Sequence, residues 1–328
     1  MSKIALFGAA GAIGQSIGKA VGAQAAPYRV VGRSRDALAA AFGADSLAEI
    51  VTWNPDDPAS VKSAAAGIDT IVYLVGGNYW QFELHPRLMQ QTLDGAIAAG
   101  VKRLVLIGTV YPYGRPRTRP IREDHPREPH TFKGRMRKAQ EDLLLAADAA
   151  GKIQATVLRL PDFYGPGVDK SFLHSAFTAA VTGGVANMVG PLDTPHEFVF
   201  VPDVGPVVAR LASTPGAYGR VWHLAGAGVT TQRAIIDEIE RQIGKRLRVR
   251  VAGKTMLRLI GLFNPLMREM VEMHYLNTDP VLMDDSALQE LLGSIRKTSY
   301  SDGVRECLAA ARQAFRTRIP NPDQIDFL

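Results

Sequence analysis

The chain has 328 residues, of which 46% are hydrophobic and 21% are charged, an ordinary composition for a globular protein. A single cysteine, Cys307, excludes an internal disulfide and a cysteine-rich metal site. No secretion signal opens the chain and no apolar run of about 18 residues predicts a membrane span, so we expect a cytoplasmic protein with no membrane partner.

The net charge is +6, and basic residues are concentrated between Arg115 and Lys138 and between Lys245 and Arg258. Such a balance is typical of proteins that bind nucleic acid, but also of proteins that bind an anionic cofactor or substrate. The sequence contains no zinc-finger or RNA-binding motif and no heptad zipper. We therefore expect a small anionic ligand and no nucleic-acid partner.

Six short apolar runs predict the strands of one sheet. They are Ile4–Phe7, Tyr28–Val31, Glu49–Thr52, Thr70–Val75, Arg103–Ile107 and Ala155–Leu160. Runs that are apolar throughout, without alternation, are typical of parallel strands buried on both faces. Alanine-rich stretches of helical length separate them, at Ala12–Ala23, Asp36–Phe42, Pro58–Ala66, Pro86–Ala99 and Gly134–Ala149. This alternation predicts an α/β fold with a doubly wound parallel Rossmann sheet.

The pattern changes after Gly167, where helices dominate. A late strand at Val221–Leu224 is expected to return to the sheet, and Leu247–Val251 alternates like a strand with one exposed face. We therefore expect a Rossmann domain over residues 1–167, to which residues 196–227 return. Residues 168–195 and 228–328 are expected to form a smaller, mostly helical substrate lobe with the C-terminal helices.

The turn after the first strand carries glycines at Gly8, Gly11 and Gly14. Glycine permits a positive φ and lets backbone N–H groups approach a diphosphate, while the next helix offers its positive N-terminal end. The strand before the turn and the helix after it are the context that a dinucleotide-binding motif requires. We predict that this turn, with Ala12 and Ile13, binds the cofactor. The alternative is an ordinary structural turn.

The end of the second strand predicts which dinucleotide is bound. NAD-binding chains usually place a carboxylate there for the ribose 2′-hydroxyl, whereas this chain has Arg33, Ser34 and Arg35. Guanidinium groups pair well with a phosphate monoester, so we predict NADP (NADPH) as the cofactor, with NAD less favoured. Asp36 weakens this prediction slightly, and the alternative is that both arginines are solvated surface charges.

Several further segments resemble the extended or atypical short-chain dehydrogenases/reductases, the group that includes the NAD-dependent epimerases and dehydratases. The similar segments, in chain order, are Asp57–Val61, Val75–Gly77, Ala99–Val105, Leu158–Gly167, Phe198–Val204 and Trp222–Gly226. The resemblance implies that Asn54 contacts adenine and that the chain runs past the cofactor at Val75 and Gly76. It also implies that Pro161 and Phe163 lie beside the nicotinamide.

The chain departs from this family at its usual catalytic tyrosine. Thr109 ends the fifth strand and could hydrogen-bond a substrate oxygen, or it could only cap the strand. The expected Tyr-x-x-x-Lys is missing, and counting back from Glu141 puts Lys133 at the tyrosine position and Arg137 at the lysine position. These three residues share one helical face.

The Lys-x-x-x-Arg-x-x-x-Glu pattern resembles the isoflavone-reductase-like enzymes, in which a lysine at the matching position performs acid/base work. We therefore predict that Lys133 is catalytic and also contacts the cofactor. The alternatives are a lysine that only holds the nicotinamide ribose, or a solvated helix with ion pairs.

Aromatic residues offer further candidates. Tyr111 could present its phenol to the substrate in place of the missing tyrosine, while Tyr79, Trp80 and Phe82 could form a wall of the pocket. His85 is expected to be a buried, hydrogen-bonded histidine. The histidines have no metal-binding spacing, so no metal is expected.

These observations favour an NADP-dependent reductase of a small carbonyl or aromatic metabolite, a soluble enzyme with Lys133, Thr109 and Tyr111 as its catalytic residues. One alternative is an NAD(P)-dependent epimerase or dehydratase acting on a sugar nucleotide. Another is a regulator that senses NADP without turnover. The resemblance also implies a homodimer formed through the helices at Pro86–Ala99 and Gly134–Ala149.

Overall fold

The computed structural model describes residues 3–318. Seven parallel strands form the central sheet in the order β10-β6-β5-β4-β1-β2-β3. Their bounds are β1 Ile4–Phe7, β2 Tyr28–Gly32, β3 Ala48–Thr52, β4 Thr70–Tyr73, β5 Arg103–Thr109, β6 Gln154–Leu160 and β10 Arg220–His223. The doubly wound Rossmann sheet and its six apolar strands are confirmed, and the late strand joins β6 as expected.

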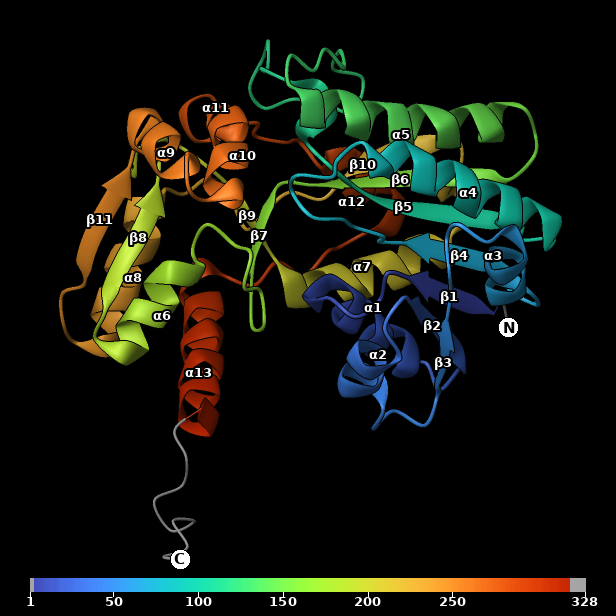
Figure 1. The fold of residues 1–328 in the computed structure, drawn as a ribbon, viewed down its shortest axis with the longest axis horizontal. Helices are drawn as coiled ribbons and strands as arrows, with labels where there is room; N and C mark the ends of the chain where they lie inside the picture. Colours follow the sequence, from blue (N-terminus) through green and yellow to red (C-terminus); the bar gives the residue numbers. More distant parts are fainter. Residues whose placement is uncertain (1–2, 319–328) are drawn as a thin grey trace, which may run out of the picture.

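Helices cover both faces of the sheet, which is why its strands are apolar throughout (Figure 1). One face carries α1 Ala12–Gly22, α2 Arg35–Phe42, α7 Val201–Ser213 and α12 Ser286–Leu292. The other carries α3 Pro58–Ala65, α4 Leu84–Ala98 and α5 Phe132–Ala149. Each set of helices encloses its own apolar core with one face of the sheet.

A smaller body lies beyond the carboxyl ends of the strands (Figure 1). Two parallel strands, β8 Val185–Val189 and β11 Arg248–Ala252, pair within it. Three helices, α6 His174–Thr182, α8 Gln232–Ile243 and α13 Tyr300–Arg318, enclose a third apolar core with them. The smaller, mostly helical C-terminal part is therefore present.

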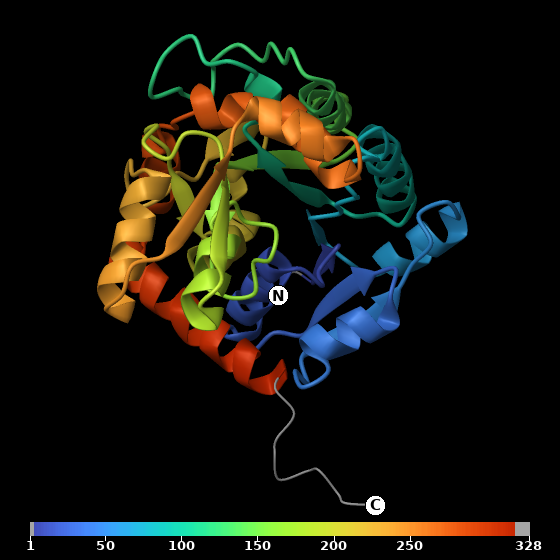
Figure 2. The ribbon, with the colours of Figure 1, turned by 60° about the vertical axis from the view of Figure 1, so that its left-hand side comes forward.

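A helical hairpin follows β11 and is drawn in orange in Figure 2, and it contacts α5 near the amino-terminal end of that helix, at Lys133. Its helices are α9 Lys254–Gly261 and α10 Pro265–Met273, and the short α11 Tyr275–Thr278 follows. Met273, Tyr275 and Leu276 pack against Val110 and Tyr113, which follow β5. The hairpin thus lies over the segment that leaves the fifth strand.

Short connections join the two bodies. The two-stranded pair of β7 Asp162–Tyr164 and β9 Phe198–Phe200 lies between them, and two single-turn helices, η1 Tyr111–Tyr113 and η2 Pro215–Ala217, complete the described elements. Helix α12 packs Leu288 and Leu292 into the core below α1 and α7, although it falls within the range expected for the substrate lobe. The domain boundaries stay a prediction.

The tightest helix contact in the Rossmann part is between α1 and α7. Gly205 lies so close to α1 that a Cβ there would be 2.1 Å from the carbonyl oxygen of Ser16. The Ser16 hydroxyl accepts a hydrogen bond from the Gly205 N–H at 3.1 Å and donates one to the carbonyl of Val201 at 2.9 Å. This contact fixes α1, and with it the turn that precedes α1, against the sheet.

We predict that Gly205→Ala lowers the free energy of unfolding by about 1–3 kcal/mol or more, because two helix backbones must separate to admit one methyl group. Gly216→Ala is the matched control, since the nearest atom to its new Cβ would be Leu291 Cδ1 at 3.5 Å. Urea unfolding of both variants measures the difference. Equal stability of the two variants would contradict the tight α1–α7 contact.

Candidate cofactor and substrate cleft

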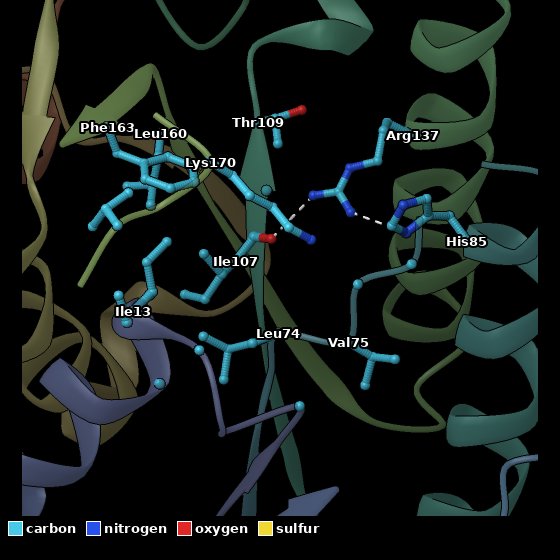
Figure 3. Close-up of a pocket in the computed structure, with 18 of the residues that line it drawn as sticks. Ile13, Leu74, Val75, His85, Ile107, Thr109, Arg137, Leu160, Phe163 and Lys170 are labelled. Atoms are coloured by element: carbon cyan, nitrogen blue, oxygen red, sulfur yellow. Dashed lines mark hydrogen bonds between the residues drawn. The ribbon is translucent and has the colours of Figure 1, made fainter. Parts of the chain in front are cut away.

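A cleft of about 460 Å³ opens at the carboxyl ends of β1, β4 and β5 (Figure 3). Strand β1 lies between β2 and β4, so the chain proceeds along the sheet in opposite directions on either side of β1. Ligands of open α/β sheets bind at such a switch point because the two crossovers diverge there and leave a crevice.

The glycine turn forms the floor of the cleft. Gly8 has a φ of +87°, and a Cβ there would lie 2.7 Å from the Val75 nitrogen. A Cβ at Gly14 would lie 2.0 Å from the carbonyl oxygen of Ala9, whereas Gly11 faces open space. Gly11 is also the N-cap of α1, and its first turn carries no side-chain cap. Uncapped N–H groups at an open helix end are suited to a diphosphate.

Most of the residues expected at the site lie together around this one cleft. The lining residues among them are Gly8, Gly11, Ala12, Ile13, Gly14, Val75, Gly76, Thr109, Tyr111, Pro161 and Phe163. Tyr79, Phe82 and His85 also line it, while Trp80 does not and is 50% exposed. The cleft therefore joins the glycine turn to the residues expected to contact substrate.

The residues expected at the adenosine end lie outside the cleft lining. Arg33 follows β2, Ser34 caps α2 by accepting from the Ala37 N–H at 3.2 Å, and Arg35 begins α2. All three are exposed. They lie at the carboxyl ends of the strands, where the glycine turn also lies, and Asn54 is exposed in the same way after β3. Their contacts with a cofactor stay a prediction.

Lys133 does not line the cleft, although it is only 1% exposed. Its Nζ pairs with Glu269 and, at 2.8 Å, with Glu272, both on α10. Its backbone N–H also donates to Glu272 at 3.1 Å, and its Nζ lies 5.6 Å from the ring centroid of Phe82. No local pattern indicates these two carboxylates, which lie 136 and 139 residues further along the chain. A catalytic role for Lys133 would require these pairs to open and stays a prediction.

Arg137, one turn after Lys133, is the cation of α5 that enters the cleft (Figure 3). Its guanidinium donates to the Ile107 carbonyl at 3.2 Å and lies 3.2 Å from Nδ1 of His85. Burial lowers the pKa of Arg137 and, together with Arg137, lowers the pKa of His85 to about 3. The spacing of the helix places Arg137 at the position of the family's lysine, but this spacing alone does not indicate that Arg137 enters the cleft.

The cleft is also lined by two residues that the sequence did not indicate. Asp169 and Lys170 follow the turn at Gly165–Gly167, and Figure 3 shows Lys170 on the side of the cleft opposite His85. Lys170 and Arg137 give the cleft two cations against the single carboxylate of Asp169. This balance suits an anionic ligand.

A pair of phenols lies beside Thr109. The hydroxyls of Tyr79 and Tyr111 are 2.9 Å apart, and burial raises the pKa of both groups. The backbone N–H of Tyr111 donates to Oγ1 of Thr109 at 3.3 Å, which leaves the threonine hydroxyl proton free for another acceptor. Both tyrosines are therefore neutral phenols near neutral pH, able to donate a hydrogen bond rather than accept a proton.

A buried ion pair fixes α5 against the sheet. Nε and Nη2 of Arg159 on β6 bind Glu141 at 3.1 and 2.5 Å, and both side chains are at most 2% exposed. Arg127 adds a contact to Glu141 at 3.3 Å. The predicted helical face of Lys133, Arg137 and Glu141 therefore has three different neighbours, namely α10, the cleft and β6.

Within residues 3–318, no group of three or more His, Cys, Asp or Glu side chains is arranged to hold a metal ion. None of the helices in that range is both long and apolar enough to span a bilayer.

Comparison with known proteins gives a family and a fold. The sequence model of the NAD dependent epimerase/dehydratase family matches residues 4–225. The dTDP-6-deoxy-L-talose 4-dehydrogenase (NAD(P)(+)) of Kitasatospora kifunensis is 26% identical over 260 residues, which cover 74% of this chain and 80% of that protein.

Solved structures share the fold at lower identity. The dTDP-glucose 4,6-dehydratase DesIV of Streptomyces venezuelae, solved with NAD, aligns with a TM-score of 0.80 at 19% identity over 97% of this chain and 99% of that one. The UDP-glucuronic acid 4-epimerase of Bacillus cereus, also with NAD, gives 0.78 at 18% identity, covering 95% and 99%. RMD of Pseudomonas aeruginosa, with NADPH, gives 0.75 at 16% identity, covering 95% and 100%.

We predict that His85 makes stability depend on pH. Its folded pKa of about 3 lies below the value of about 6.5 in an unfolded chain, so only the unfolded chain gains this proton between those limits. The free energy of unfolding should therefore fall as pH drops below about 6.5, by about 1.4 kcal/mol per pH unit for this group. Urea unfolding at several values from about pH 6 to pH 4.5 measures this dependence. In His85→Asn the free energy of unfolding should change less steeply with pH, by the amount that one proton contributes. An unchanged slope would show that His85 is protonated in the folded protein.

Proposed function

Because this chain belongs to the NAD-dependent epimerase/dehydratase family, we propose that it is an NAD(P)-dependent enzyme that transfers hydride at a hydroxyl- or keto-bearing ring carbon of a sugar nucleotide. Dehydrogenation, epimerisation and dehydration of a sugar ring can all begin with hydride removal at such a carbon. The proposal therefore covers the shared chemistry of the relatives and does not choose among their final products.

One observation carries the proposal. A single cleft joins the glycine turn after β1 to Thr109, Tyr111 and Arg137, so a dinucleotide on the turn would extend toward hydrogen-bonding groups. The relatives support a sugar nucleotide as substrate, which was the alternative expectation, over a small carbonyl or aromatic metabolite. The two cations in the cleft are compatible with a phosphorylated substrate.

The residues of the turn fit a dinucleotide. The lack of a side chain at Gly11 leaves open space at the uncapped end of α1, and Gly8 keeps the turn close to the strand end at Val75. When bound, the nicotinamide supplies the hydride acceptor or donor. Pro161 and Phe163 form the facing wall of the cleft and would orient the ring.

Neighbouring hydroxyls bind the reacting oxygen, and Lys133 stays the predicted acceptor of the proton that leaves a substrate hydroxyl as its hydride is removed. Thr109 can donate a hydrogen bond to the reacting substrate oxygen, since its own acceptor position is used by the Tyr111 N–H. The Tyr111 phenol, hydrogen-bonded to Tyr79, can donate to the same oxygen when negative charge develops on it. Arg137 would stabilise that charge because it is buried and no carboxylate lies within 4.0 Å of it among the described residues.

A second candidate function follows from the pairing of Lys133. With Nζ held by Glu269 and Glu272, the helix position expected to carry the acid/base group does not face the cleft. A chain that binds the dinucleotide without turnover, as a cofactor-sensing regulator, would need no such group. Turnover measurements separate this function from the first.

We predict that Arg33 and Arg35 favour NADPH over NADH by at least about tenfold in Kd, because a guanidinium pair binds the 2′-phosphate. Calorimetric titration with NADPH, NADP, NADH and NAD measures the preference. Arg33→Ser combined with Arg35→Ser should remove it while leaving NADH binding unchanged. Lys152→Ser combined with Lys245→Ser, two exposed lysines away from β2, is the matched loss of two charges. A parent protein that prefers NADH would contradict this role of the arginines.

We predict turnover of dTDP- or UDP-linked hexoses and none of the same hexoses without the nucleotide. Turnover is followed by the ultraviolet absorbance of the reduced nicotinamide and by chromatography of the sugar nucleotide, because epimerisation and dehydration restore the oxidised cofactor. Thr109→Val should lower kcat by about 10²–10⁴-fold, since it removes a hydrogen bond to the reacting oxygen. Lys133→Met tests the predicted acid/base role, and undiminished turnover would exclude it. Tight cofactor binding with no turnover of any nucleotide sugar would favour the regulator.

A further inference from the structure

A second cavity, of about 620 Å³, lies on the other side of α10 and shares no lining residue with the cleft. We call it the basic cavity, because its lining includes Arg115, Arg135, Lys254 and Arg258. The first two belong to the basic stretch at Arg115–Lys138 and the last two to that at Lys245–Arg258. The fold thus brings together two concentrations of positive charge that are far apart in the sequence.

None of these four cations has a carboxylate oxygen within 4.0 Å among residues 3–318, whereas Arg268 of the same hairpin lies 3.8 Å from Glu269. Arg135 donates only to the carbonyl of His130, at 3.1 Å. All four side chains belong to exposed residues and can reorient toward a ligand. An uncompensated group of cations around one cavity attracts an anion.

The other polar groups of the cavity leave this positive field in place. Glu272 lines it, but both its oxygens are bound by Lys133, at 3.1 and 2.8 Å. Burial, then Arg115 and Arg135, lower the pKa of His130, against an opposing effect of Glu272. Burial and Lys254 lower the pKa of His274. The charge on the two histidines is therefore disfavoured until an anion is present.

Two groups at the cavity lack hydrogen-bond partners among the described residues. His274 is 8% exposed, and its Nε2 is buried with no hydrogen-bond partner in the described part of the chain. Helix α9 begins at this cavity with Gly253 as its N-cap, and no side chain caps its first turn. Backbone N–H groups at a helix start add to the positive field and can donate to phosphate oxygens.

The apolar part of the lining is aromatic. Phe132 is 42% exposed although it is a large apolar residue, and Tyr275 packs edge-on against His130 with ring centroids 4.5 Å apart. An exposed ring beside a group of cations suits a planar ring that carries phosphate. The cavity is also of the size that binds small molecules, and it is not an extended groove for a nucleic-acid chain.

We propose that the basic cavity is a second ligand site, which binds a nucleoside diphosphate or a similar phosphorylated aromatic molecule separately from the cofactor and substrate cleft. Arg115, Arg135, Lys254 and Arg258 bind the phosphates, and Phe132 stacks on the base. The site does not rest on the proposed function, because its residues take no part in the cleft. Its lobe residues also lie outside the segment matched by the family, residues 4–225.

The test is calorimetric titration of the full chain, saturated with NADP or NAD, with UDP, ADP and inorganic pyrophosphate. We expect ADP to bind at one site per chain, and UDP at one site in the basic cavity besides any site in the cleft, both more tightly than pyrophosphate. Arg115→Ala combined with Arg258→Ala should weaken nucleotide binding at least about tenfold, since each guanidinium makes a charge-assisted contact with phosphate. Phe132→Ala should weaken UDP and ADP but not pyrophosphate.

Arg268→Ala is the matched control, because Arg268 is an exposed arginine of the same hairpin that does not line the basic cavity. It should bind UDP like the parent. Equal weakening by Arg268→Ala, no binding of any probe, or ADP binding that survives the double variant would overturn the proposal. Loss of UDP binding in Thr109→Val would also overturn it, since it would place the nucleotide in the cleft. All of these measurements are of binding and none is of turnover. The test can therefore be read even if the proposed function is wrong.

Discussion

The buried pair of Glu141 and Arg159 is the interaction on which the site depends. Neither charge reaches solvent, so each is stable only because the other is present, and removing one partner of such a pair typically costs about 3–5 kcal/mol. The pair fits because Gly108 has no side chain: a Cβ there would lie 3.3 Å from Oε1 of Glu141. Arg159 also lies 4.5 Å from the ring centroid of Tyr113, which ties the segment after β5 to the same point.

This anchor determines where the rest of α5 presents its side chains. Arg137 lies one turn before Glu141 and therefore reaches the carboxyl end of β5, where it binds the Ile107 carbonyl. Lys133 lies one turn further, beyond the sheet edge, where α10 supplies two carboxylates. Three residues at four-residue spacing thus serve three purposes, because the helix extends from the sheet core past the cleft to the hairpin.

The parallel sheet and the glycine turn could be predicted from the sequence because their signals are local. Apolar runs such as Thr70–Tyr73 are buried on both faces, and Gly8 precedes its helix within a few residues. The resemblance to the family added Pro161 and Phe163, which line the cleft, while their place beside the nicotinamide stays a prediction. The position of Lys133 could not be predicted, since it depends on Glu269 and Glu272 from a hairpin that no local pattern places beside α5. The grouping of Arg115 with Arg258 depends on the same packing.

Glu272 belongs to two environments at once, since its carboxylate binds Lys133 on the side of α5 and also lines the basic cavity. An anion in that cavity would repel this carboxylate and alter its hold on Lys133, at the foot of the helix that carries Arg137 into the cleft. If an anion in the cavity changes the affinity of the cleft for its ligand by some factor, linkage requires that ligand to change the anion affinity by the same factor. One shared side chain would then couple two ligands that never touch.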